Sequence, residues 1–272
     1  HNQIYDENKA LGDYALPAEG RMSLNEMLDI ACSWFNKTLK ENEITKPEVE
    51  YYVSFENSWK KSIHWPPCNS SKKSFYLSKK ELASIPSNEK STFVDFTFDP
   101  MKPYPTVGGA NFHFFLNNIG IKNQSEMKDR EDLISFESKL FQEKTTYAGG
   151  VEVELYISSE GKGTDFTAKL CKKDSLGNVW NLVDGISRIE STERLNKPTK
   201  VLINLGHIAF QIKKGEKLIL QVSSSNFPKY NRNPNTGIHP MDATELRAVK
   251  QRVYYGINQP SKLILNQLYY EK

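Results

Sequence analysis

The chain has 272 residues and a mass of 31.2 kDa, with 36 basic and 33 acidic residues and a formal net charge of +3. Hydrophobic residues make up 38% and charged residues 25%, a globular composition that excludes wholesale disorder. The balanced charge and scattered lysines argue against a nucleic-acid partner. No apolar run approaches the ~18 residues that a membrane span needs, so we expect no membrane contact.

The chain opens with HNQIYDENKALGDY, which lacks both an initial Met and the basic-then-apolar order of a signal peptide. This opening favours a fragment or a processed piece over a complete protein. Cys32, Cys68 and Cys171 are widely separated and odd in number, which favours free thiols in a reducing, cytoplasmic compartment. No Cys/His pair has metal-ligand spacing, so we expect neither a metal site nor a cofactor.

The first predicted element is an amphipathic helix over residues 23–40. Ser23 followed by Glu26 is a capping-box pattern, and Lys37 and Lys40 lie in the last turn, where the helix dipole favours cations. The apolar residues recur at steps of three and four and form one stripe. They are Leu24, Met27, Leu28, Ala31, Trp34, Phe35 and Leu39. We expect this stripe to pack against a large surface.

From residue 47 onward the hydrophobic period changes to two, which predicts strands. In residues 151–158 every second residue is apolar, as expected of a strand with one buried face. The predicted strands are 48–55, 91–99, 133–140, 150–158, 164–172, 178–187, 200–210, 216–224, 246–255 and 261–268. Residues 174–178 and 213–216 have the composition of hairpin turns. Residues 57–92, rich in Lys, Ser and Pro, are predicted to be mostly loop.

Short strands without helical crossovers between them predict a mainly-β fold. The expected architecture is a galactose-binding-like jelly-roll β-sandwich, preceded by a helical segment. We therefore divide the chain into residues 1–46 and a β domain over residues 47–272.

Several strings resemble the C-terminal part of the cocaine esterase-like (CocE/NonD) and X-Pro dipeptidyl-peptidase-like serine hydrolases. They are FDPMKPYPTVGG (98–109), DREDLISFES (129–138), GTDFTAKL (163–170), LVDGISR (182–188), SSSNFPKYNRNPNTG (223–237) and PSKLIL (260–265). In that family this region is a non-catalytic jelly roll that packs on an α/β-hydrolase domain. The resemblance implies that residues 1–46 are the C-terminal segment of such a catalytic domain. It departs from the family at Gly163, commonly acidic, and at Tyr104, usually a small aliphatic residue.

The same resemblance aligns His1 with the family's catalytic histidine. As general base, His1 would take the proton of the serine and return it to the leaving group. The alternative is a terminal or tag residue without function. The chain contains no G-x-S-x-G elbow, and the run Ser223–Ser225 ends a strand without flanking glycines. The chain is therefore expected to be inactive alone and to need a catalytic N-terminal portion of the same protein. The expected substrate is a small ester or peptide, and a homodimer is left open.

A run of aromatics follows the turn at Gly108 and Gly109. It consists of Phe112, His113, Phe114 and Phe115. The matching loop in the family is part of the acyl-pocket wall, so the resemblance implies a substrate pocket here. The alternative is that these side chains belong to the β core or to a domain interface. The other histidines, His64, His207 and His239, are expected to be structural.

A structural interface with the catalytic portion is predicted at Trp59, Trp65, Asn226, Arg232 and Asn235. The string NSWKKSIHWPP resembles the crossover that packs both tryptophan rings on the hydrolase body. The Asn- and Ser-rich run at 222–237 is expected to bond to itself, because these side chains form turns with neighbouring backbone groups. We expect this run to brace the β domain, with Arg232 as a forked donor.

Other interpretations remain open. Asp165 and Asp184 suggest a pair of glycosidase carboxylates, but structural roles at strand ends, where they would accept backbone N–H groups, are favoured. The tryptophans, Trp180 among them, could stack on sugars in a carbohydrate-binding module. A third alternative is an adhesion or oligomerisation domain. The sequence does not choose between esterase and peptidase activity.

Overall fold

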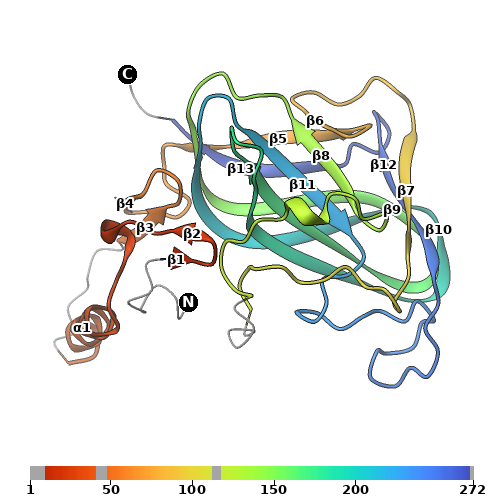
Figure 1. The fold of residues 1–272 in the computed structure, drawn as a ribbon, viewed down its shortest axis with the longest axis horizontal. Coiled ribbons are helices and arrows are strands. Elements are labelled where there is room, and N and C mark those ends of the chain that lie inside the picture. Colours follow the sequence, from red (N-terminus) through yellow and green to blue (C-terminus); the bar gives the residue numbers. More distant parts are fainter. Residues whose placement is uncertain (1–9, 41–47, 112–117, 270–272) are drawn as a thin grey trace.

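The structure is a computed structural model that describes residues 10–40, 48–111 and 118–269 (Figure 1). Its largest part is a nine-stranded sheet. The strands are β5 (Ser70–Ser78), β6 (Glu81–Ala83), β7 (Thr92–Phe98), β8 (Ile134–Ser138), β9 (Thr145–Lys173), β10 (Val179–Ile212), β11 (Lys217–Ser223), β12 (Val249–Tyr255) and β13 (Lys262–Leu268).

This sheet closes on itself. β9 pairs with β13 along one part of its length and with β11 along another, so that β11, β8, β6, β5, β13 and β9 form a ring. The pairs are antiparallel except for β6 with β8. The predicted mainly-β class is confirmed in the form of a barrel-like sheet. The jelly-roll connectivity and the galactose-binding-like arrangement stay predictions.

Two strands are much longer than predicted. The segments expected at 150–158 and 164–172 are joined in β9, which has 29 residues, and those at 178–187 and 200–210 are joined in β10, which has 34. Register shifts between Ile189 and Thr199 mark the irregular stretch where β10 bends without leaving β9. Bulges therefore replace the chain breaks that the sequence pattern indicated.

Residues 57–92 contain more strand than the sequence predicted, although half of them lie outside strands. They contain β5 and β6 of the ring as well as a strand outside it. β5 pairs with β13 over its whole register from Ser70 to Tyr76. Its alternation is visible only at Phe75 and Leu77, which are buried, because the residues that precede them in the strand, SSKKS, are all polar.

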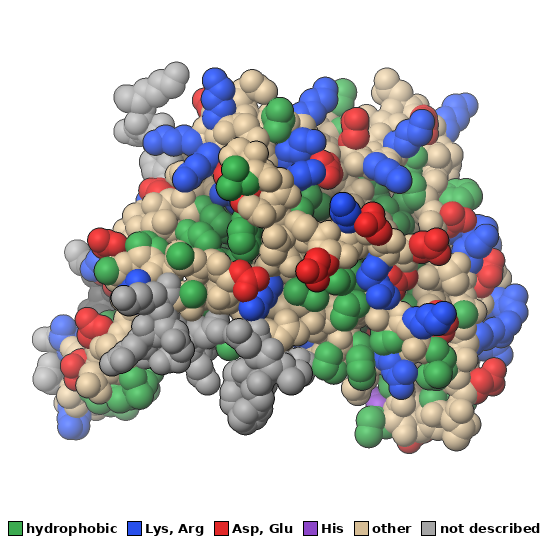
Figure 2. All heavy atoms as spheres, viewed as in Figure 1, with side chains coloured by type: hydrophobic (Ala, Val, Ile, Leu, Met, Phe, Trp, Pro, Cys, Tyr) green, Lys and Arg blue, Asp and Glu red, His purple; other side chains and the backbone are tan. Residues whose placement is uncertain are grey.

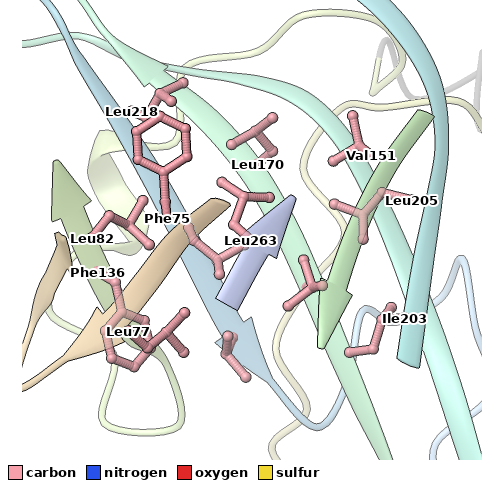
Figure 3. Close-up of a cluster of buried hydrophobic side chains, with 14 of the residues drawn as sticks. Phe75, Leu77, Leu82, Phe136, Val151, Leu170, Ile203, Leu205, Leu218 and Leu263 are labelled. Atoms are coloured by element: carbon pink, nitrogen blue, oxygen red, sulfur yellow. The ribbon is translucent and has the colours of Figure 1, made fainter. Parts of the chain in front are cut away.

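The core fills the interior of this sheet. In Figure 3, side chains from β5, β6, β8, β9, β10, β11 and β13 converge, among them Phe75, Phe136 and Leu218. Val151, Val153, Leu155 and Ile157 are each 1% exposed or less, so the predicted buried face of residues 151–158 is confirmed. Complete burial of a side chain of this size is worth about 1.5–3 kcal/mol, which makes this cluster the main source of stability.

A separate hairpin of β3 (Val49–Val53) and β4 (Ser58–Ser62) lies against the barrel. The amide of Ser54 donates to the carbonyl of Ala209 at 3.1 Å, and the amide of Gln211 donates to the carbonyl of Ser54 at 2.9 Å. Beneath the hairpin, Val53 packs in a second, smaller core with Ala148, Ala209 and Leu268. Backbone bonds and packing therefore both attach this hairpin to β10.

The N-terminal part begins with the paired strands β1 (Ala10–Leu11) and β2 (Tyr14–Ala15). Helix α1 (Leu24–Phe35) follows and is extended by a π-helical turn, Asn36–Lys40, so the helix predicted over 23–40 is confirmed. The predicted capping box is present. The Glu26 amide donates to the Ser23 hydroxyl at 3.1 Å, and the Ser23 amide donates to the Glu26 carboxylate at 2.7 Å.

Helix α1 lies apart from the barrel, and its apolar stripe is exposed (Figure 1). Leu24, Leu28, Trp34 and Phe35 are about half exposed, and Leu39 is 70% exposed. Figure 2 shows hydrophobic side chains gathered on one side of this helix, at the lower left. Within the described ranges nothing covers this stripe, so the large surface expected against it is not found there. A search of the described helices finds none that could span a membrane.

Candidate functional site

The predicted catalytic His1 and the predicted pocket residues Phe112, His113, Phe114 and Phe115 lie outside the described residues. The structure does describe the two segments that flank residues 112–117 along the chain. We call residues 106–111 and 118–124 the loop base. The second of these segments lies next to β1 and β2.

The two halves of the loop base are held together by backbone and asparagine bonds. Gly109 and Gly120 exchange both backbone bonds, at 2.7 and 3.1 Å. The Asn118 side chain accepts from the Gly108 amide at 2.7 Å and donates to the Thr106 carbonyl at 2.6 Å. The two described segments that flank residues 112–117 along the chain are therefore held side by side.

The N-terminal segment lies directly on the loop base. The Ile121 amide donates to the Leu11 carbonyl at 3.1 Å, and the Asp13 amide donates to the Ile121 carbonyl at 2.7 Å. The Asp13 carboxylate also pairs with the Lys122 ammonium at 2.7 Å. Gly12, between the two backbone bonds, has φ +72, and a Cβ there would lie 2.3 Å from the Ile121 carbonyl oxygen. Only glycine fits this approach.

Two buried side-chain amides, one of them within the loop base itself, hold the loop base together. The Asn181 side chain accepts from the Lys122 amide at 2.6 Å and donates to the Gly120 carbonyl at 3.1 Å. The Gln124 side chain donates to the Val107 carbonyl at 3.0 Å and to the Lys122 carbonyl at 3.1 Å, so it spans both halves. The Lys169 ammonium on β9 donates to the side-chain oxygen of Gln124 at 2.8 Å.

Sequence reasoning missed these three residues. Lys169 lies on β9 between Ala168 and Leu170, whose side chains point into the core on the other face of the strand. Burial of the Lys169 ammonium lowers its pKa. The available signal was a lysine inside the string GTDFTAKL, where both faces of the strand are buried. Nothing in the sequence near Gln124 or Asn181 marks them as supports, because each bonds to segments far away along the chain.

The two aspartates that suggested a glycosidase are each paired with a cation. Asp165 accepts from the Arg188 guanidinium at 2.9 and 2.7 Å and from the Asn233 amide at 2.9 Å. That bond to Asp165 is the main reason why the pKa of Arg188 is raised. Asp184 pairs with the Lys229 ammonium at 2.8 Å and accepts a short hydrogen bond from the Asn226 amide. Their roles are structural, as favoured, but the donors are side chains where backbone N–H groups were expected.

The run at 222–237 bonds to itself and to neighbouring segments, as predicted. Asn235, which adopts φ +59, accepts from the Thr164 hydroxyl at 3.2 Å and donates to the Arg247 carbonyl at 2.8 Å. The Arg232 guanidinium donates to the Pro100 carbonyl at 3.0 Å. These bonds lie within the β domain, so the bracing of a catalytic portion by Asn226, Arg232 and Asn235 stays a prediction.

The tryptophans lie on different elements. The Trp59 indole donates to the Glu19 carbonyl at 2.8 Å and ties β4 to the segment before α1. The Trp65 indole donates to His207 Nδ1 on β10 at 2.7 Å, so this ring rests on the barrel. Trp180 donates to Asp174 at 2.9 Å and packs against the core, whereas Trp34 is exposed on α1. The described part of the chain thus has no common platform of tryptophan rings for a sugar.

A model of the X-Pro dipeptidyl-peptidase C-terminal non-catalytic domain matches residues 42–264. This chain belongs to that family. Membership in a non-catalytic domain family agrees with the lack of a G-x-S-x-G elbow in the sequence.

One relative of this C-terminal domain carries the name of an esterase. Cocaine esterase of Rhodococcus sp. (strain MB1 Bresler) is 31% identical over 238 residues, which cover 80% of this chain and 41% of the relative. The resemblance to the C-terminal part of cocaine esterase-like and X-Pro dipeptidyl-peptidase-like hydrolases is therefore confirmed.

Solved structures show the same fold. An aminopeptidase from the marine sediment archaeon Thaumarchaeota archaeon superimposes with a TM-score of 0.83 at 21% identity, covering 99% of this chain and 48% of that one. An α-amino acid ester hydrolase gives 0.79 at 24% identity, covering 97% and 48%. The X-Pro dipeptidyl-peptidase C-terminal domain described here thus spans less than half the length of each of these relatives.

Proposed function

We propose that this chain is the C-terminal portion of a cytoplasmic serine hydrolase that cleaves esters or amides through an acyl-enzyme. The catalytic portion of the same protein would supply the serine and the oxyanion hole. His1 would be the general base, and residues 112–115 would form part of the acyl-pocket wall. The observation that carries the proposal is the docking of residues 11–13 on the loop base.

This docking supports a site shared by His1 and residues 112–115, because it fixes two segments of backbone beside each other. Two backbone bonds and one ion pair hold residues 11–13 against Ile121 and Lys122. The described backbone that follows His1 in the chain is therefore held against the described backbone that flanks Phe112.

The exposed stripe of α1 supports a catalytic portion as the partner. Large apolar side chains that are half exposed over three helical turns mark a surface that another body covers. The relatives contain more than half of their length outside the region matched by this chain. Asn226, Arg232 and Asn235 would keep the neighbouring surface rigid, and Trp59 would orient α1 through its bond to Glu19.

Hydrolysis of p-nitrophenyl esters tests the assignment. The chain alone is expected to be inactive, and activity is expected when it is produced together with the missing catalytic portion. In the reconstituted enzyme, His1→Gln should abolish turnover, whereas His239→Gln, at an exposed position outside the loop base, should leave it unchanged. Turnover by the chain alone, or an active His1→Gln enzyme, would overturn the assignment.

The pocket role needs its own measurement. In the reconstituted enzyme, Phe114→Ala is expected to change the ratio of kcat/KM between esters with small and large acyl groups. The matched control is Phe93→Ala, which removes a ring that is 45% exposed on the edge strand β7. Equal ratios in the wild type and in alanine variants of Phe112, Phe114 and Phe115 would exclude the pocket role without affecting the assignment as a hydrolase portion.

A further inference from the structure

A small cavity lies beside β9, beneath the run at 222–237. Its volume is about 10 Å3, and its polar lining consists mainly of Tyr104, Thr167, Lys169, Gln221, Ser225 and Asn226. This is the size of one water molecule. The backbone around it is fixed, because the Tyr104 amide donates to the Ser225 hydroxyl at 2.7 Å and the Thr167 hydroxyl donates to the Ser225 carbonyl at 3.1 Å.

The Lys169 ammonium at this cavity has few partners for a buried cation. The residue is 6% exposed, and its ammonium donates to Gln124 at 2.8 Å and lies 5.1 Å from the centre of the Tyr104 ring. Its cross-strand neighbour Asp184 directs its carboxylate to Lys229 and Asn226. No salt bridge in the described part of the chain includes Lys169. An ammonium carries three N–H donors, so a further acceptor is needed.

Two other polar atoms of the lining residues also need partners. The Tyr104 hydroxyl and the Asn226 side-chain oxygen are fully buried and have no hydrogen-bond partner among the described residues. Both residues are 2% exposed. Buried polar groups in folded proteins are almost always bonded, either to protein or to an internal water.

We propose that this cavity is an internal water site. The water accepts hydrogen bonds from the Lys169 ammonium and the Tyr104 hydroxyl and donates one to the Asn226 oxygen. Water fits because it is both donor and acceptor, and the site offers groups of both kinds in the volume of a single molecule. A chloride ion would be larger and would face the negative end of the Asn226 amide, so an anion does not match this lining.

The water also explains how Lys169 is held against Gln124. With its ammonium fixed from both sides, Lys169 keeps the Gln124 oxygen in place, and the Gln124 nitrogen then spans Val107 and Lys122. The water site thereby acts on the position of the loop base. This inference does not depend on the proposed hydrolase activity.

The sign of one stability change tests the proposal. If Tyr104 bonds to the water, Tyr104→Phe breaks that bond, and the Tm of the chain should fall by about 2–4 °C. If the hydroxyl has no partner, its removal relieves a buried unpaired group, and the Tm should rise. The control is Tyr254→Phe, whose hydroxyl bonds to the Ser158 hydroxyl at 3.0 Å and whose loss should lower the Tm in either case.

A crystal structure of the wild-type chain at better than about 2 Å resolution gives the second test. The proposal expects one density peak within hydrogen-bond distance of Lys169 Nζ, the Tyr104 hydroxyl and Asn226 Oδ1. A cavity without density, an anomalous peak there after a bromide soak, or a Tyr104→Phe variant at least as stable as the wild type would each overturn it.

Discussion

At the scale of single residues, the buried carboxylate of Asp165 is neutralised by partners from distant segments. Asp165 is 1% exposed and is held by Arg188 from the neighbouring strand and by Asn233 from the run at 222–237. Such a carboxylate is tolerated inside a protein only while its donors remain. The pair therefore matters most when one member is removed.

Arg188→Met should lower the free energy of unfolding by about 3 kcal/mol, because it leaves the Asp165 carboxylate buried without its cation. Urea denaturation measures this change. Lys250→Met is the control, since the Lys250–Asp95 pair is 3.9 Å long and about half exposed, and its loss should be close to neutral. Equal effects of the two substitutions would contradict the prediction.

Gly12 gives a second prediction at this scale. Gly12→Ala should detach the N-terminal segment from the loop base, because the new Cβ would collide with the Ile121 carbonyl oxygen. Limited proteolysis should then cut the segment before α1 faster than in the wild type. Gly177→Ala, at φ +89 with nothing within 4 Å of the added Cβ, carries a similar backbone strain without a collision. The prediction fails if both variants are cut at the same rate within residues 10–20.

At the scale of secondary-structure elements, the sequence predicts strands well where one face is continuously apolar. Residues 151–158 are such a case, and all four of the expected inward side chains are buried. The full length of β9 was not predictable, because glycines near residue 163 are typical of a strand end and here only mark a bulged stretch. β5 was missed because Ser71 and Lys73 occupy the positions that share a face with Phe75 and Leu77, where apolar side chains would have shown the period.

The capping box of α1 predicts a pH dependence. The Ser23 backbone bond, followed by its side-chain bond, lowers the pKa of Glu26 below its usual 4.5. A lowered folded-state pKa means that the stabilisation is complete above the ordinary glutamate pKa and is lost as the pH falls through the folded-state value. Hydrogen exchange of the first-turn amides of α1 should therefore quicken relative to unfolded controls below about pH 4.5.

Glu26→Gln is the matched control for this effect. The glutamine can still accept from the Ser23 amide but has no charge to lose, so its helix should show a weaker pH dependence over the same range. Ser23→Ala should destabilise the helix N-terminus at every pH, by about 0.5–2 kcal/mol. An unchanged acid response in Glu26→Gln would show that another group is responsible.

At the scale of the whole molecule, the exposed apolar stripe of α1 is predicted to be a contact with the catalytic portion. Trp34→Asp should weaken binding of the chain to the catalytic portion at least about tenfold, because it puts a charge in an apolar contact. Lys37→Asp changes charge in the exposed turn that follows the helix and serves as control. Titration calorimetry with the separately produced catalytic portion measures both, and equal affinities for the two variants would exclude this stripe as the contact.

The candidate site was predictable only in part. The family resemblance rests partly on residues 98–109 and 163–170. The first string includes part of the loop base, and the second includes Lys169, which bonds to Gln124. The docking of residues 11–13 and the supports Gln124, Asn181 and Lys169 depend on contacts between segments far apart along the chain, such as the bond from Lys169 to Gln124. Neither period nor composition carries that information, because it exists only once the sheet has closed.

The length of β9 and β10 has a consequence for how the molecule unfolds. β9 and β10 form one long antiparallel hairpin, and β11, β12 and β13 each pair with β9. The nine-stranded sheet is therefore expected to unfold as one unit. Calorimetry of the β domain should accordingly give one sharp transition, with equal calorimetric and van't Hoff enthalpies.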